Sequence, residues 1–244
     1  MPKRNILILE KTESPWIEFL KDFFEDTLAS LHFTRDSAEA GGLFDSLRPP
    51  IVFANPELLS LAFSQKLKVF RQSSPDFRLF AIGAGKSPEG FPAEECFETP
   101  EAMEQFQKKF IQRLAFPEKI HVQVVDDEKE IGSMLRDFLE NRVAPAFHVD
   151  YAPNGKIGIE MMEKKMPDVL VLDIKMPVMD GREAYREIKQ RGWTVPVIVF
   201  FDAISGDEMT EIHQYGKPAV VDKGSRQSSM PEMMSLVKKM AYFG

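Results

Sequence analysis

The chain has 244 residues, of which 43% are hydrophobic and 28% are charged, and its formal net charge is -7. This length fits one or two domains that can each bury a hydrophobic core. The composition excludes disordered, collagen-like and disulfide-scaffold proteins. The acidic balance argues against a broad nucleic-acid-binding surface.

The sequence also bears on the compartment. A single cysteine, Cys96, cannot form a disulfide within the chain, which is typical of proteins in a reducing compartment. No run approaches the ~18 apolar residues of a membrane span, and the first residues lack the long apolar region of a signal peptide. We therefore expect a cytoplasmic protein with no membrane segment and no direct nucleic-acid binding.

Phenylalanine and methionine are unevenly distributed along the chain. Of the 20 Phe residues, 15 lie in residues 1–117, whereas 11 of the 13 Met residues lie in residues 118–244. Two cores with different side chains predict two domains, 1–117 and 118–244. The boundary is placed at Phe116-Pro117-Glu118 because proline ends a helical pattern there.

In the first half, short apolar runs alternate with helical spacing. They predict strands at 6–9, 31–33, 51–54 and 77–82. Ser14-Pro15 is expected to cap a helix, residues 57–70 to form another, and Thr99-Pro100 to cap a closing helix. Glycine and proline in residues 83–92 predict no helix or only a short one there.

The second half follows the same order at an offset of about 117 residues, which indicates duplication. Strands are predicted at 120–125, 147–151, 169–172, 195–201 and 219–221, each followed by helical spacing. Ser205 and Glu208 form a capping-box pattern, and Pro231 is expected to open the last helix. Apolar strands alternating with helices predict an α/β fold in which each half is a doubly wound (βα)5 domain with a parallel five-stranded sheet.

Charged residues follow three strands of the second half. Asp126 and Asp127 follow the first strand, Asp173 the third and Lys223 the fifth. The carboxyl ends of parallel strands meet at one edge of the sheet, so we expect these groups to converge. Three carboxylates repel one another unless a cation lies between them, and Mg²⁺ suits such a site. A carboxylate beside a metal and a lysine is also a candidate nucleophile for an aspartyl phosphate.

Residues 173–181, Asp-Ile-Lys-Met-Pro-Val-Met-Asp-Gly, resemble the phosphoacceptor loop of two-component response regulator receiver domains, the CheY-like family. Residues 124–127 resemble its acidic pair, Asn154-Gly155 the start of its second helix and Lys223 its lysine, so that the resemblance covers 119–244. It implies a flavodoxin-like fold and phosphoryl transfer from a sensor histidine kinase or phosphotransfer protein to Asp173, with Lys223 contacting the phosphate. It further implies that Mg²⁺ is held by Asp126, Asp127, Asp173 and the main-chain carbonyl of Lys175.

Three positions depart from the family pattern. The position after the fourth strand, usually Thr or Ser, is Phe201 or Asp202, and neither offers a neutral hydroxyl to the phosphoryl group. Val220 stands where an aromatic residue is usual, and Gly224 where proline usually follows the lysine. We expect the phosphorylation chemistry to survive and the conformational switch to differ.

The first half resembles a receiver whose site has been lost. Aligned with the second half, it has Asn55 in the place of Asp173 and Glu10-Lys11 in the place of Asp126-Asp127. Asn55 cannot form an acyl phosphate, Lys11 is expected to bring a positive charge into the metal position, and no counterpart of the site lysine is found. This half is therefore predicted to be a degenerate, or pseudo-, receiver.

The chain has four histidines. His32, His121, His148 and His213 share no metal-ligand spacing, and we expect them to be surface or satisfied core side chains.

The leading hypothesis is a response regulator without enzymatic activity that signals through contacts with a downstream protein or as a homodimer. One alternative is a fragment of a longer regulator with an output domain after Gly244, and another is a phospho-independent scaffold. A Mg²⁺-dependent phosphatase of the haloacid dehalogenase type is disfavoured because Lys175 stands where that family needs a second aspartate.

Overall fold

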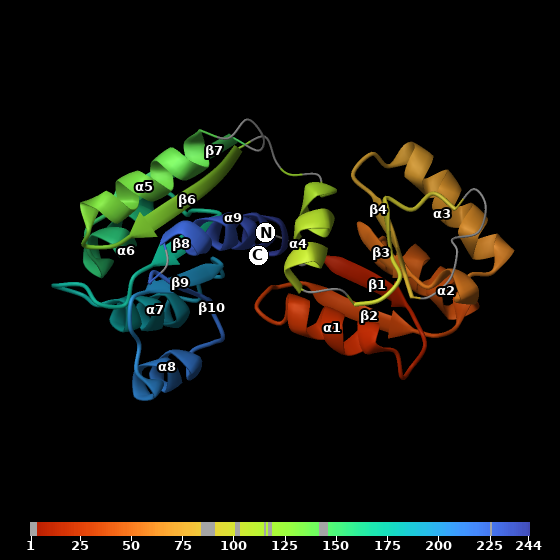
Figure 1. Ribbon diagram of the computed structural model, residues 1–244, viewed down its shortest axis with the longest axis horizontal. Coiled ribbons are helices and arrows are strands. Elements are labelled where there is room, and N and C mark those ends of the chain that lie inside the picture. The colour runs from red at the N-terminus through yellow and green to blue at the C-terminus, as the bar shows by residue number, and fades with distance from the viewer. Residues whose placement is uncertain are drawn as a thin grey trace. The chain divides into compact units, whose positions relative to one another are not determined.

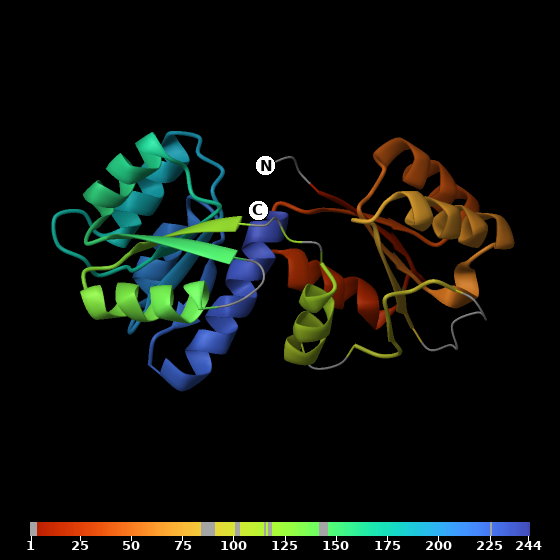
Figure 2. The ribbon, with the colours of Figure 1, turned by 90° about the horizontal axis from the view of Figure 1, so that it is seen from above.

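The computed structural model describes residues 4–83, 91–100, 103–114, 116, 119–141, 146–224 and 226–244. The chain divides into two compact units, essentially Met1–Ala115 and Phe116–Tyr242. In each unit, helices flank a five-stranded sheet on both faces, as Figure 1 and Figure 2 show from two directions. Among the described helices, none is both long enough and apolar enough to cross a membrane.

The first unit has a parallel sheet with the strand order β2-β1-β3-β4-β5. Its elements, in chain order, are β1 (Asn5–Leu9), α1 (Pro15–Phe24), β2 (Ser30–Thr34), α2 (Ser37–Leu47), β3 (Ile51–Ala54), a 3-10 helix (Pro56–Leu58), α3 (Leu61–Ser73), β4 (Arg78–Ile82), β5 (Glu95–Phe97) and α4 (Met103–Gln112).

Aromatic side chains fill the core of the first unit. On one face of the sheet, Trp16 and Phe23 of α1 pack against Phe106 of α4, with the two phenylalanine rings 5.0 Å apart between centroids. Phe53 of β3 lies beneath them. The other face is covered by α2 and α3 through Ala40, Phe44, Phe63 and Leu67.

The second unit has a parallel sheet with the strand order β10-β9-β8-β6-β7. Its elements are β6 (Lys119–Val125), α5 (Lys129–Glu140), β7 (Ala146–Ala152), α6 (Gly155–Lys164), β8 (Val169–Leu172), α7 (Gly181–Gln190), β9 (Val197–Phe201), α8 (Gly206–His213), β10 (Ala219–Asp222) and α9 (Arg226–Phe243).

Successive side chains of these strands point to opposite faces of the sheet, where they form two separate hydrophobic cores. Ile120, Val122 and Val124 of β6 pack with α5 and α9 on one face, whereas Val125 joins α6, α7 and α8 on the other. Because both faces are covered, the central strands β8 and β9 are apolar along their whole length, whereas β6 also carries His121 and Gln123. The predicted fold class, two doubly wound (βα)5 units with parallel five-stranded sheets, is confirmed.

Two helices differ from the prediction. The helix expected at 57–70 is divided into the 3-10 helix and α3, because Ser60 caps a new helix by accepting a hydrogen bond from the N–H of Phe63 at 3.2 Å. The last helix begins at Arg226, so the prediction that Pro231 opens it is wrong. Proline inside a helix removes one backbone hydrogen bond, but the buried Met233 and Val237 anchor this helix in the core.

Two elements of the first unit, α2 and the three-residue strand β5, were not recognised in the sequence. The residues 84–90, expected to lack a long helix, and the residues 101–102, between the expected cap at Thr99-Pro100 and α4, lie outside the described part of the chain.

Candidate functional site

Three of the predicted site residues each stand one position beyond a strand of the second unit. Asp126 follows β6, Asp173 follows β8 and Lys223 follows β10. Their backbone N–H groups donate to carbonyls of neighbouring strands at 2.6–3.0 Å, so the sheet ladder extends through each of them. Since β6 and β8 are neighbours and their chain connections leave in opposite directions, the site lies where the strand order reverses.

The lysine bridges the two buried aspartates. Nζ of Lys223 lies 2.8 Å from Oδ2 of Asp126 and 3.1 Å from Oδ1 of Asp173. The three side chains are only 5%, 2% and 7% exposed, so the charges interact with little screening by water. The lysine ammonium therefore holds both carboxylates at the same edge of the sheet.

Burial and charge act in opposite directions on these groups. Burial raises the pKa of Asp173 to about 6, although Lys223 opposes the rise. Burial also raises the pKa of Asp126 against the effect of the same lysine. For Lys223 burial favours the neutral form, but the contacts with both carboxylates outweigh it and its pKa rises. The aspartates thus carry an unfavourable charge that a second cation would relieve.

The three predicted acidic ligands fit a divalent cation. Asp126, Asp127 and Asp173 each offer an oxygen within 4.8 Å of the others. Asp126 and Asp173 are buried, whereas Asp127 is exposed at the rim. Oxygen ligands of this kind suit Mg²⁺, which keeps part of its water shell. Lys175 has an exposed side chain and lines the hollow beside Asp127.

That hollow has a volume of about 300 Å³ and is framed by the loop after Asp173 and by α7 and α8. Charged side chains from both helices reach it. Its lining residues are Asp127, Ile174, Lys175, Met176, Pro177, Asp180, Arg182 and Glu208.

Close backbone contacts hold the loop 173–181 in place. A Cβ atom added to Gly181 would lie only 2.0 Å from the carbonyl oxygen of Asp173, so this position requires glycine. Asp180 caps α7 and forms a capping box with Glu183. Val178 has a φ of 72°, a left-handed conformation that β-branched residues avoid.

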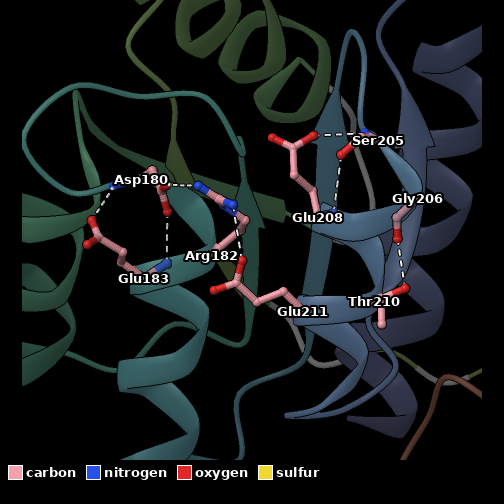
Figure 3. Close-up of polar contacts among 8 residues, drawn as sticks. All are labelled: Asp180, Arg182, Glu183, Ser205, Gly206, Glu208, Thr210 and Glu211. Atoms are coloured by element: carbon pink, nitrogen blue, oxygen red, sulfur yellow. Dashed lines mark hydrogen bonds and ion pairs between the residues drawn. The ribbon is translucent and has the colours of Figure 1, made fainter.

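A polar network joins α7 to α8 beside the hollow, and Figure 3 shows Arg182 between two acidic side chains. Arg182 contacts Asp180 at 2.7 Å and Glu211 of α8 at 3.0 Å. At the start of α8, the predicted capping box of Ser205 and Glu208 is confirmed. Arg182 and Glu211 were missed in the sequence, because a charged pair 29 residues apart has no local pattern.

The end of β9 carries no hydroxyl side chain. Phe201 is the last residue of the strand and packs partly buried against the core that contains α7, whereas Asp202 follows the strand and is exposed. Val220 of β10 is 41% exposed. Of these two departures, only that at the end of β9 lies next to Lys223, because Phe201 pairs with Asp222.

The first unit has the same backbone arrangement with different side chains. Glu10 follows β1 and Asn55 follows β3, and their N–H groups donate to Thr34 and Leu9 as those of Asp126 and Asp173 do to their neighbouring strands. Nδ2 of Asn55 donates to Oε1 of Glu10 at 2.9 Å, and both side chains are 3% exposed. A neutral amide thus occupies the place of the carboxylate.

Lys11, which stands in the place of Asp127, carries a positive charge that interacts with Glu10 and Glu57. Nζ of Lys11 is paired with Glu57 at 2.7 Å on the surface, where the lysine side chain is 58% exposed. Its long side chain reaches a partner outside the buried pair. Directly after β5, in the place that Lys223 has after β10, stands Glu98.

Comparison with known proteins defines the class. A family model described as the response regulator receiver domain matches residues 122–235. The chemotaxis protein CheY of Halobacterium salinarum is 30% identical over 114 residues, which is 47% of this chain and 92% of that protein. The receiver domain of CheB from Thermotoga maritima, a solved structure, has a TM-score of 0.46 at 23% identity and covers 51% of this chain and 98% of that one.

Other relatives are longer than the matched region. The protein-glutamate methylesterase/protein-glutamine glutaminase 2 of Methanosarcina acetivorans is 38% identical over 117 residues, which is 47% of this chain. This chain spans 22–33% of the length of that protein, of two similar enzymes and of the response regulator MprA of Mycobacterium ulcerans.

The chain belongs to the response regulator receiver family, the CheY-like domains of two-component signalling.

Proposed function

We propose that this chain is a response regulator that accepts a phosphoryl group on Asp173 from a sensor histidine kinase or phosphotransfer protein. The observation that carries the proposal is the contact of Lys223 with both Asp126 and Asp173 at the reversal of the strand order. This contact supports the proposal because a candidate nucleophile, a positive charge and a candidate metal ligand meet at one edge of the sheet. Lys223 would contact the transferred phosphoryl oxygens.

In the proposed step, an oxygen of ionised Asp173 attacks the phosphorus atom of a phosphohistidine. The new P–O bond forms as the P–N bond breaks, and the imidazole leaves with the electron pair and takes a proton from solvent. Asp126, Asp127, Asp173 and the main-chain carbonyl of Lys175 would hold Mg²⁺, which would supply positive charge to offset that of the phosphoryl oxygens. The ammonium group of Lys223 then contacts an oxygen of the phosphoryl group in place of one of its carboxylate contacts.

The domain limits 1–117 and 118–244 are part of the proposal, with the second as the phosphorylatable receiver. The first unit is proposed as a pseudo-receiver. Asn55 has no ionisable oxygen, and its amide is already bonded to Glu10. Glu98 after β5 would repel a phosphate where Lys223 attracts one. This unit would serve as a scaffold or dimerisation surface.

The output is proposed to be a protein–protein contact with a downstream target or a second copy of the chain, in the cytoplasm, with no membrane or nucleic-acid contact. The chain itself is proposed to have no enzymatic activity. The methylesterases among its relatives match this chain over only 22–33% of their own length.

The test is labelling by acetyl phosphate in the presence of Mg²⁺. The wild-type chain should be labelled, and Asp173→Asn should abolish the label. Asp137→Asn, an exposed acidic position on α5, is the matched control and should be labelled as the wild type is. Persistent labelling of Asp173→Asn would refute the assignment.

A phospho-independent scaffold is a second candidate, favoured by Phe201 at the end of β9 where receivers usually carry a hydroxyl. Beryllofluoride with Mg²⁺ mimics the phosphoryl group and separates the two. Mg²⁺-dependent beryllofluoride binding that changes the elution volume in gel filtration supports the regulator, whereas no binding supports the scaffold.

A further inference from the structure

Two histidines and an aspartate form a cluster near the amino end of β6 and β7. His121 and His148 are direct partners in the parallel pairing of these strands, and their rings stack with centroids 5.6 Å apart. Asp150, two residues beyond His148, faces the same side of the sheet because side chains alternate along a strand. The absence of a metal-ligand spacing in the sequence was misleading here, because the cluster forms across two strands.

The donor atoms converge as they would around a metal ion. Nε2 of His121 lies 2.8 Å from Oδ2 of Asp150, and Nε2 of His148 lies 3.3 Å from Oδ1. The three residues each offer an atom within 4.8 Å of the others. Ligands about 2 Å from a tetrahedral metal ion are separated by roughly 3.3 Å, so small side-chain shifts suffice to close the site.

Burial makes one ligand rigid and leaves another accessible. The side chain of His121 is 9% exposed, and its Nδ1 has no hydrogen-bond partner among the residues that the structure describes. The side chain of His148 is 58% exposed, so an ion can enter from solvent. His121 is therefore not the satisfied core side chain expected from the sequence.

Carboxylates surround the cluster. Oε1 of Glu140 lies 3.8 Å from Nδ1 of His148. A small rotation of either side chain would let this carboxylate accept a hydrogen bond from Nδ1 and so orient the imidazole ring. Oδ2 of Asp168 accepts a hydrogen bond from the backbone N–H of His121 at 2.8 Å. This negative surrounding attracts a dication and supplies the second layer of contacts that histidine ligands usually have.

We propose that His121, His148 and Asp150 bind a transition-metal dication of the zinc class. Imidazole nitrogen favours such ions over Mg²⁺, which prefers oxygen. The position is separate from the acidic site, because Asp126 lies five residues beyond His121, directly after the end of β6, a rise of about 16 Å. A bound ion would tie the edge strand β7 to its neighbour β6. This inference does not depend on phosphorylation at Asp173.

The test is calorimetric titration of the tag-free full chain with Zn²⁺ in excess Mg²⁺, so that Mg²⁺ competes for the acidic site. The wild type should bind one Zn²⁺ per chain at this site. His148→Ala and Asp150→Asn should each lower the affinity by at least about tenfold. His213→Ala, an exposed histidine on α8, and Asp173→Asn are controls that should bind as the wild type does.

Cobalt gives a direct spectroscopic readout. Co²⁺ added to the wild type should produce the visible absorption of a nitrogen-ligated ion, and His148→Ala should lose it. Because His148 is exposed, this variant should stay folded, which circular dichroism checks. Equal Zn²⁺ affinity in the wild type and His148→Ala, or a wild type that binds no Zn²⁺, would overturn the proposal, as would a loss of binding in Asp173→Asn.

Discussion

At the scale of single residues, the site holds two buried carboxylates with one ammonium. Asp126, Asp173 and Lys223 are almost completely buried, and one lysine cannot neutralise two aspartates. The raised pKa of Asp173, about 6, is the consequence. Two buried carboxylates with one ammonium suit the binding of a cation and a phosphoryl group. When neither is bound, the excess buried negative charge lowers the stability of the fold.

This imbalance predicts that Asp173→Asn stabilises the protein in Mg²⁺-free buffer at pH 7.5. A folded-state pKa of about 6 against an ordinary 3.8 means that ionisation of Asp173 costs the fold stability, at most about 3 kcal/mol. Because Asn also leaves Lys223 with one partner, we expect a gain of roughly 1–2 kcal/mol in urea unfolding. Folding raises this pKa, so the wild type loses stability as pH rises from about 4 to about 6.

The stability gained by Asp173→Asn should therefore shrink as pH falls through 6, since Asp173 of the folded wild type is then protonated. A variant less stable than the wild type at pH 7.5 would show that Lys223 fully compensates both charges. Added Mg²⁺ should raise the stability of the wild type more than that of Asp173→Asn.

A second residue-scale prediction concerns Val178, which has a φ of 72° and is 78% exposed. A β-branched side chain in the left-handed region costs about 1–2 kcal/mol. Asparagine tolerates this region, so Val178→Asn should raise the free energy of unfolding by about 1 kcal/mol. Val220→Asn, at an exposed position of β10, is the matched control and should give no gain. An unchanged or lower thermal midpoint for Val178→Asn would contradict the assigned strain.

At the scale of elements, the walls of the hollow come from the starts of two helices. α7 begins at Gly181 against the backbone of Asp173, and α8 begins with the Ser205–Glu208 capping box. Arg182 links the two helices through Glu211. Helix α8 follows β9, and β9 ends beside the site. The stability of α8 should therefore affect any conformational change that passes from the site to this helix.

Ser205→Ala should cost about 1 kcal/mol of stability, because the hydroxyl accepts from the N–H of Glu208 at 3.2 Å. Ser133→Ala, within α5, should cause no loss because alanine favours helix. Chemical denaturation of both variants measures the difference. Equal midpoints for the two variants would show that the capping box contributes nothing.

Elements and strand ends were predictable from the sequence to different degrees. The strand that runs into Asp173 was found because burial on both faces leaves a continuous apolar run, and those before Asp126 and Lys223 were found because they are rich in apolar residues. The strand β5 has three residues, of which only Phe97 is buried, and gives no such signal.

Contacts across elements were not predictable. The pairing of His121 with His148 depends on the register of their strands. The direction of the Lys11 side chain depends on which acidic partner it contacts. The extra turn of α9 before Pro231 depends on tertiary packing. Local sequence patterns do not carry this information.

At the scale of the whole molecule, two units share one backbone plan and differ in chemistry. The N–H groups of Glu10 and Asn55 make the same ladder bonds as those of Asp126 and Asp173. Only the second unit combines an aspartate, an acidic pair and a lysine at this edge among the described residues. The division of roles, with one phosphorylatable receiver and one pseudo-receiver, is the central proposal.

The most direct measurement is to map the phosphoryl group in the full-length wild type. The chain is treated with acetyl phosphate and Mg²⁺, the acyl phosphate is reduced with borohydride, and peptides are sequenced by mass spectrometry. The proposal predicts a single modified aspartate, Asp173, and no modified residue in 1–117. Modification of another aspartate, or of any residue in the first unit, would contradict it.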